Sequence, residues 1–89
     1  MFLEDDILLF LDSTKWKEIG IIWSEVETLK KRRDGVVLVH SINLFWSISK
    51  LMEDGLIERR NNNFGKFECR LTKNGLRKKI KNSGLFLVS

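Results

Sequence analysis

The 89-residue chain has no proline, no tyrosine, one cysteine and one histidine. A lone Cys69 cannot form an internal disulfide, which excludes a disulfide-stabilised secreted scaffold and favours a reducing cytoplasm. His40 and Cys69 are together too few to build a four-ligand zinc site. We therefore expect a cytoplasmic protein that requires no metal and no other cofactor.

Long apolar runs and catalytic motifs are also missing. The longest apolar run, residues 7–11, is far shorter than the roughly 20 residues that span a bilayer. Acidic rather than basic residues precede this run, so a signal peptide is not expected. The sequence has no glycine-rich phosphate loop, no nucleophile elbow and no paired histidine motif. We expect neither a membrane segment nor an enzyme.

What is abundant is positive charge, and it is distributed unevenly. The chain carries a net charge of +4. Residues 1–29 hold seven acidic and two basic side chains, whereas residues 30–89 hold fourteen basic and five acidic ones. This asymmetry indicates a polyanionic partner for the basic part, although a solvated, solubilising surface would show the same pattern.

The length allows one domain, residues 1–89, that hides about 60–65% of its unfolded surface. Apolar spacing predicts a first helix over 3–13, and the β-branched run 19–23 predicts a short strand. Ser24 and Glu27 have the spacing of a capping box for a second helix that ends at Gly35. The basic run 30–33 near its end fits either the helix dipole or contact with phosphates.

The second half of the chain predicts a helix, a hairpin and a last helix. We expect a third helix over about 42–54, with Ser41 as N-cap and Gly55 as the residue after its end. Its inward stripe is Leu44, Phe45, Ile48, Leu51 and Met52, and its opposite face is Asn43, Trp46, Ser47, Ser49 and Lys50. Strands over 56–60 and 67–71, joined by the loop 61–66, form the hairpin, in which we expect Phe64 to pack as a lid. Thr72 caps a final helix from Lys73 to about Asn82, and an apolar tail follows at 85–88.

This order of elements is that of a winged helix-turn-helix, and two motifs carry a resemblance to small regulators of the MarR and PadR type. Leu51, the run Gly55-Leu56-Ile57 and the basic pair Arg59-Arg60 resemble the exit of a recognition helix into the first wing strand. Phe67 and the run Leu71-Thr72-Lys73-Asn74-Gly75 resemble the second wing strand and the helix start that follows it. The resemblance covers roughly residues 20–80. It implies an α+β fold with a three-helix core, a β-hairpin wing and a short C-terminal helix.

The resemblance also places candidate DNA contacts. Base-edge contacts are expected from the third helix, since Asn can pair with adenine and Lys can reach guanine or a phosphate. Wing residues of such proteins contact phosphates or enter a minor groove. The resulting DNA-binding set is Ser41, Asn43, Trp46, Ser47, Lys50, Arg59, Arg60 and Lys66. An ordinary solvated helix face and hairpin, with Trp46 packed on the wing or the tail, is the competing interpretation.

The expected function is sequence-specific binding of double-stranded DNA by a dimeric transcriptional regulator, or by an operator or centromere binder of a plasmid or virus. The apolar runs 7–11 and 85–88 exceed what a small core can cover, which predicts a homodimer. The chain lacks a long C-terminal dimerisation helix and room for an effector pocket, so no small-molecule effector is expected. The alternative is a winged-helix module that docks on other proteins in a larger assembly.

Overall fold

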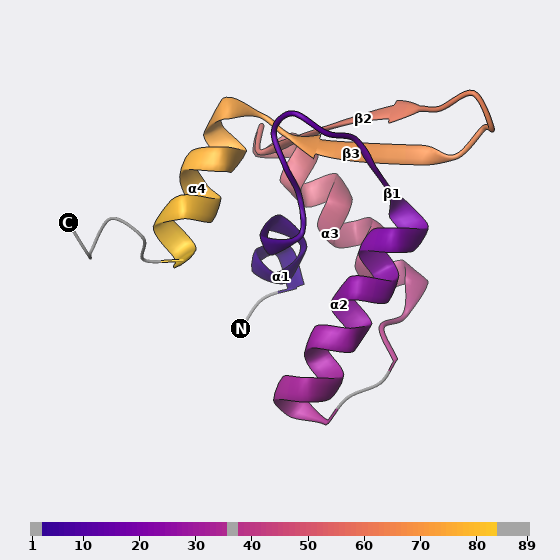
Figure 1. Ribbon diagram of the computed structural model, residues 1–89, viewed down its shortest axis with the longest axis vertical. Helices are drawn as coiled ribbons and strands as arrows, with labels where there is room; N and C mark the ends of the chain where they lie inside the picture. Colours follow the sequence, from indigo (N-terminus) through magenta and orange to yellow (C-terminus); the bar gives the residue numbers. More distant parts are fainter. Residues whose placement is uncertain (1–2, 36–37, 84–89) are drawn as a thin grey trace.

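The computed structural model describes residues 3–35 and 38–83, which contain four helices and one three-stranded antiparallel sheet (Figure 1). The elements follow the order α1 (Leu3–Leu9), β1 (Lys17–Glu18), α2 (Ile19–Asp34), α3 (Ser41–Glu53), β2 (Ile57–Asn61), β3 (Phe67–Leu71) and α4 (Lys73–Ser83). The sheet has the strand order β1-β3-β2. The predicted α+β class and the predicted hairpin are therefore confirmed.

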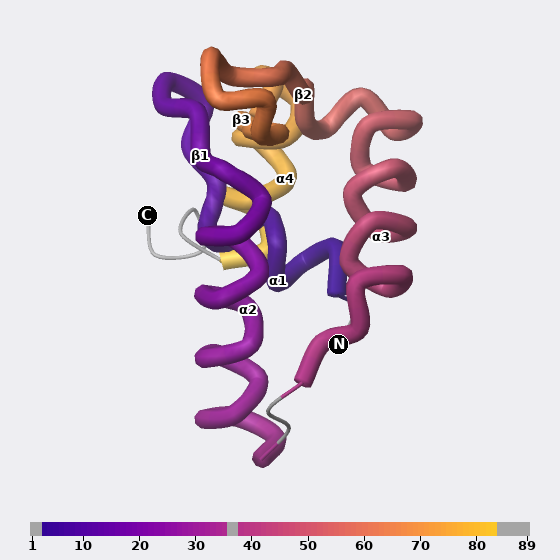
Figure 2. Tube along the Cα trace, turned by 90° about the vertical axis from the view of Figure 1, so that its right-hand side faces the viewer, coloured from indigo at the N-terminus to yellow at the C-terminus, as the bar shows by residue number. Residues whose placement is uncertain are grey.

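The core lies between α1, α2, α3 and one face of the sheet. Helix α1 sits between α2 and α3, as Figure 2 shows in the view along the hairpin. The side chains that are nearly or fully inaccessible to solvent include Ile7, Leu8, Leu11, Ile22, Val26, Leu44, Leu51, Cys69 and Leu71. These residues come from α1 and the loop after it, from α2, from α3 and from the sheet, and they form a single core cluster.

The first helix is shorter than the predicted 3–13, because the chain after Leu9 bonds to other elements. The N–H groups of Phe10 and Leu11 close tight turns onto Ile7 and Leu8. The carbonyl of Asp12 then accepts the N–H of Leu71 at 2.8 Å, and the carbonyl of Leu11 accepts the Lys79 ammonium at 2.8 Å. Since these carbonyls serve β3 and α4, they are not available to continue the helix.

The predicted strand at 19–23 is wrong, because these residues form the first turns of α2. Ile19, Ile22 and Val26 are buried at helical spacing, so packing against the core overrides the β preference of the isoleucines. The strand at this point is only β1, Lys17–Glu18, which pairs with β3. The capping box is wrong as well: Ser24 lies inside the helix, and the Glu27 carboxylate accepts the N–H of Val39 at 2.8 Å.

The ends of α2 and α3 follow the predictions more closely. Gly35 ends α2 in the left-handed conformation, with φ 73°. Helix α3 begins at Ser41 itself, with His40 in the N-cap position, so the predicted start is late by one residue. Gly55 follows α3 with φ 72°, and the N–H groups of Gly55 and Leu56 return to the carbonyls of Met52 and Leu51. This pair of bonds is a Schellman motif, which explains why a glycine stands there.

The base of the hairpin is bonded directly to the start of α4. Thr72 donates its N–H to the carbonyl of Leu56 and its hydroxyl to the carbonyl of Gly55, at 3.1 and 2.6 Å. The Thr72 hydroxyl oxygen also accepts the N–H of Gly75, which confirms Thr72 as the cap of the last helix. A Cβ at Gly75 would lie 1.8 Å from the Leu56 carbonyl oxygen, so only glycine fits. The Leu71 to Gly75 motif thus fixes the hairpin relative to α3.

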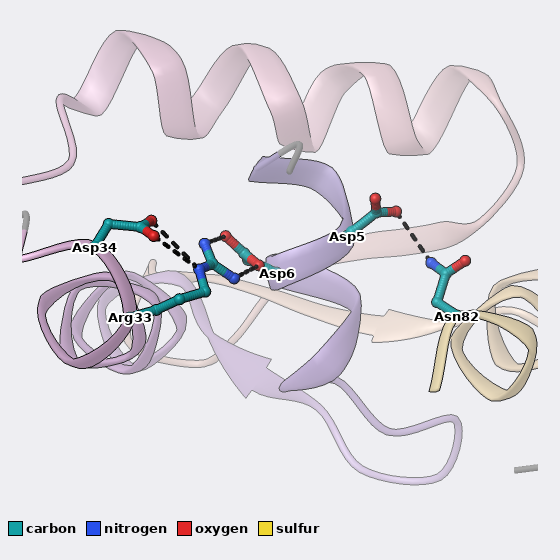
Figure 3. Close-up of polar contacts among 5 residues, drawn as sticks. All are labelled: Asp5, Asp6, Arg33, Asp34 and Asn82. Carbon is teal, nitrogen blue, oxygen red and sulfur yellow. Dashed lines mark hydrogen bonds and ion pairs between the residues drawn. The ribbon is translucent and has the colours of Figure 1, made fainter. Parts of the chain in front are cut away.

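Two polar contacts tie α1 to the helices around it (Figure 3). The fully buried Asp6 carboxylate accepts two hydrogen bonds from the Arg33 guanidinium, at 2.9 and 3.0 Å, and Arg33 also contacts Asp34. The hydrogen bond with Asp6 raises the pKa of Arg33 above its ordinary value, so the guanidinium stays charged. On the other side of α1, Asn82 donates to Asp5 at 3.0 Å. Arg33 therefore stabilises the packing of α1 against α2, although it belongs to the basic run 30–33.

Candidate nucleic-acid interface

The outward face of α3 differs from the predicted one at two positions. Ser41, Asn43, Trp46 and Lys50 are exposed, as predicted. The prediction that Ser47 lies on the outward face is wrong. This residue is only 3% exposed, because it projects to the same side as the buried Leu44, Ile48 and Leu51. Phe45 was expected inside, yet 42% of its side chain is exposed.

The first half of the exposed face of α3 is largely apolar, whereas Ser49, Lys50 and Glu53 make its second half polar. Ile42, Phe45 and Trp46 stand three and four positions apart and are 79%, 42% and 63% exposed. We call these three residues the α3 apolar stripe. Ile42 was not among the predicted site residues, although its position one turn before Trp46 was visible in the sequence. Exposed apolar side chains that lie together in this way are typical of surfaces that contact a partner.

The two faces of the hairpin hold different chemistry. Arg59 pairs with Cys69 in the sheet register, so it lies on the face that covers the core. There its guanidinium stacks on the Phe67 ring, with 4.4 Å between the guanidinium carbon and the ring centroid. We call this side the inner face. At the free end of the hairpin it continues past the core toward α3.

Arg60 lies on the opposite, outer face of the hairpin, where its guanidinium contacts Glu68 and Trp16. Its Nε is 3.0 Å from a carboxylate oxygen of Glu68, and its guanidinium stacks on Trp16 at 4.3 Å. Arg70 stacks on the same Trp16 ring at 4.5 Å and forms an ion pair with Glu58. The outer face is thus a network in which each arginine has an acidic partner, and Arg60 points away from α3.

The tip of the hairpin is shaped by Asn62. Its side-chain oxygen accepts the N–H groups of Phe64 and Lys66, at 2.9 and 3.1 Å, and its side-chain nitrogen donates to Glu18 of β1 at 2.7 Å. Phe64 is 85% exposed, so the expectation that it packs as a lid is wrong. The bonds of Asn62 hold the backbone at Lys66 in a defined place beside β1.

Basic residues lie on both sides of the α3 apolar stripe. On one side, Lys66 and Phe67 of the hairpin line a pocket with Phe45 and with Gly20 at the start of α2. On the other side, Lys30 of α2 lines a pocket with Asn43 and Trp46. Asn43 and Phe45 are two positions apart and so project about 200° from each other around the helix. The structure therefore places Lys66 and Lys30 at opposite edges of α3.

The basic residues near α3 and in the hairpin differ in whether they form an ion pair with an acidic side chain. Within residues 3–35 and 38–83, no ion pair joins Lys30, Arg59 or Lys66 to an acidic side chain. Lys50 has Asp54 as a neighbour one turn on, at 3.7 Å. Of the predicted wing residues, Arg59 and Lys66 are on the side of α3, whereas Arg60 is not. Lys30 joins them from a run whose role the sequence left open.

The described part of the chain holds no group of three or more His, Cys, Asp or Glu side chains that could bind a metal ion. In the same residues, no helix combines the length and the apolar character needed to span a bilayer. Cys69 lies fully buried in β3, and burial raises the pKa of its thiol to about 11. Such a thiol is a core side chain rather than a nucleophile.

A scan of protein-family models found no match for this sequence, and searches of curated proteins and of solved structures found no similar protein.

Proposed function

We propose that this chain is a winged helix-turn-helix protein that binds double-stranded DNA sequence-specifically. In this proposal α2 and α3 form the helix-turn-helix, α3 enters the major groove, and the β2–β3 hairpin is the wing. The observation that carries it is the placement of Lys30 and Lys66 at the two edges of an exposed helix, with Arg59 on the same side of the hairpin. The biological role we propose is transcriptional regulation, or operator or centromere binding in a plasmid or virus.

The dimensions of α3 support this placement. An α-helix with its side chains is about 10–12 Å across, and the major groove of B-DNA is about 12 Å wide. The two phosphate backbones run along the edges of that groove. A helix in the groove with cations at both of its edges would therefore bring one cation to each backbone. Lys30 and Lys66 fit this requirement.

A second candidate is a protein-docking module, and the α3 apolar stripe favours it. Exposed aromatic side chains are enriched in protein interfaces. The two candidates differ in their dependence on salt. Binding to DNA releases counterions, so log K falls with log salt by about 0.9 for each phosphate contacted.

The test is fluorescence anisotropy with a labelled random-sequence duplex at several salt concentrations between about 50 and 200 mM. We expect binding that weakens with salt, and a double variant Lys30→Ala/Lys66→Ala whose slope is smaller by about 1.8 for each protomer bound. The matched control is Lys73→Ala/Arg77→Ala, which removes the same charge from exposed positions of α4. Figure 1 shows that α4 lies across the molecule from the free end of the hairpin. If both double variants change the slope equally, binding depends on net charge and the proposed interface is wrong.

A homodimer is part of the proposal, although the run 7–11 offers less apolar surface for a dimer contact than its sequence indicates. Ile7, Leu8 and Leu11 are covered within one chain, so in the run 7–11 only Leu9, which is 40% exposed, and the partly buried Phe10 offer apolar surface to a second copy. The tail 85–88 lies outside the described residues. A two-fold dimer would still place two α3 helices about 34 Å apart, one turn of DNA, and imply a palindromic site. Light scattering of the full-length chain tests this, and a monomer at all concentrations would remove the dimer from the proposal.

A further inference from the structure

We infer that α3 recognises thymine through the C5-methyl groups that line the major groove, so that the target is thymine-rich duplex DNA. The inference rests on the proposed function and specifies the class of sequence bound. The observation behind it is that the α3 apolar stripe occupies the first half of the exposed helix face, between the two edges where Lys30 and Lys66 stand, while Ser49 and Glu53 lie on the second half.

The three tryptophans show how unusual Trp46 is. Trp23 donates its indole N–H to the carbonyl of Val39 at 2.8 Å, and Trp16 stacks under two arginines. Trp46 is 63% exposed and makes no hydrogen bond through its indole within the part of the chain that the structure describes. A large apolar surface held in solvent costs free energy, which a partner with apolar groups at the same place would recover.

In the first half of α3, hydrogen-bonding groups are scarce beside the stripe, because the exposed Ser49, Lys50 and Glu53 all lie in the second half. Lys50 has Asp54 beside it, and Asn43 projects toward the Lys30 edge rather than outward. In the major groove, guanine, adenine and cytosine offer hydrogen-bond donors and acceptors, whereas thymine adds an apolar methyl group. A stripe of isoleucine, phenylalanine and tryptophan matches that methyl group, and its one polar group, the indole N–H of Trp46, can donate only a single hydrogen bond to a base edge. Thymine is therefore the base that this face discriminates best.

Charge favours DNA over a protein as the occupant of the stripe. Lys30 and Lys66 have no acidic partner among the described residues, and they flank the stripe from two different elements. An apolar protein partner does not require cations on both sides of the contact. A DNA groove does, because a phosphate backbone borders each side of the methyl groups.

The experiment compares a thymine-rich duplex of mixed sequence with the same duplex in which every thymidine is replaced by deoxyuridine. The replacement removes the methyl groups and keeps base pairing and phosphate charge. Burying one methyl changes affinity about fourfold, so two or more contacted methyls predict a loss of tenfold or more. The salt dependence should stay the same for the two duplexes. In a duplex rich in guanine and cytosine, 5-methylcytosine in place of cytosine should strengthen binding.

Variants assign the effect to the stripe. Trp46→Ala should abolish most of the discrimination between thymidine and deoxyuridine and leave the salt slope unchanged, because it removes no charge. The matched control is Phe64→Ala, which removes an aromatic side chain of similar exposure at the hairpin tip and should leave the discrimination intact. Both side chains are exposed, so neither change should unfold the domain, and circular dichroism checks this.

Failure of the inference and failure of the proposed function give different results. Salt-dependent binding with equal affinity for the two duplexes, or with discrimination that survives Trp46→Ala, overturns thymine recognition by the stripe and leaves DNA binding standing. Absence of salt-dependent binding to any duplex overturns both, and the stripe then becomes a surface for a protein partner.

Discussion

Arg59 and Arg60 are neighbours in the sequence, yet they lie in opposite environments. Arg60, on the outer face of the hairpin, is held by Glu68 and Trp16, and Arg70 beside it is held by Glu58. Arg59, on the inner face, stacks on the ring of Phe67 and forms no ion pair within the described part of the chain. Strand register, and not the number of basic residues, therefore decides which positive charges a partner can reach.

The basic run of α2 divides in the same manner. Arg33 makes its two hydrogen bonds to the buried Asp6, so it holds α1 against α2. Lys30, one turn earlier, lies beside Asn43 and Trp46 at the edge of α3. One member of the run therefore belongs to the fold, and another belongs to the proposed interface.

The largest loss of stability is expected at Gly75, where the start of α4 packs on Leu56, the residue that precedes β2. Gly75→Ala would force the added Cβ against the Leu56 carbonyl and shift the base of the hairpin, which should lower the free energy of unfolding by about 1–3 kcal/mol or more. Gly20→Ala is the matched control, because an added Cβ there meets nothing within 4 Å. In an exposed helical turn it should stabilise the fold by up to about 1 kcal/mol.

Urea denaturation of the two glycine variants measures both changes. Equal and small effects would show that the contact between Leu56 and Gly75 does not set the position of the hairpin. The comparison of inner and outer faces would then lose its structural basis.

The next effect separates the two arginines. Arg59→Ala should reduce the slope of log K against log salt by about 0.9 for each protomer bound, since each protomer loses one phosphate contact, with little change in stability. Arg60→Ala should leave the slope nearly unchanged and lower the free energy of unfolding by about 0.2–1 kcal/mol, because Glu68 loses an exposed partner. Anisotropy and urea denaturation of the same two samples give both values. The reverse pattern would place the DNA on the outer face.

The smallest effect concerns Cys69, which lies opposite Arg59 on the inner face. Burial raises the pKa of its thiol from 9.0 to about 11, and the charge of Arg59 opposes this rise. Because the unfolded thiol ionises first, the stability contributed by the neutral thiol is complete below pH 9 and is lost as the pH rises toward 11. Arg59→Ala should raise the pKa further. Thiolate absorbance during a pH titration measures it, and a Cys69 thiol that ionises near its ordinary pKa would contradict the burial of this face.

Much of the fold was predictable, because short-range chemistry specifies it. Gly35, Gly55 and Thr72 each perform the local task that their sequence context indicated, at helix ends and at a cap. The helical conformation of residues 19–23, where a strand was expected, was not predictable in this way. Its isoleucines favour a strand locally, and only the core contacts of Ile19 and Ile22 make the segment helical.

The candidate site was predictable in its location but not in its chemistry. Helical spacing alone left the rotation of α3 open by about one position, and that rotation decides that Ser47 is buried and Phe45 is exposed. The ion pair of Arg60 with Glu68 and its stacking on Trp16 depend on cross-strand register, which cannot be read from amino-acid composition. Lys30 was visible only as one member of a basic run. Its place beside Trp46 follows from the packing of α2 against α3.

The most direct test of the central claim is a nuclear magnetic resonance titration of the isotope-labelled full-length protein with a duplex. We expect the largest amide shift changes in the first half of α3, around Ile42 and Trp46, and at Arg59 and Lys66 of the hairpin. Signals of the outer face, at Glu58, Glu68 and Arg70, should move little. Shift changes centred on the outer face or on α4, with α3 unaffected, would contradict the claim that α3 and the inner face of the hairpin bind the DNA.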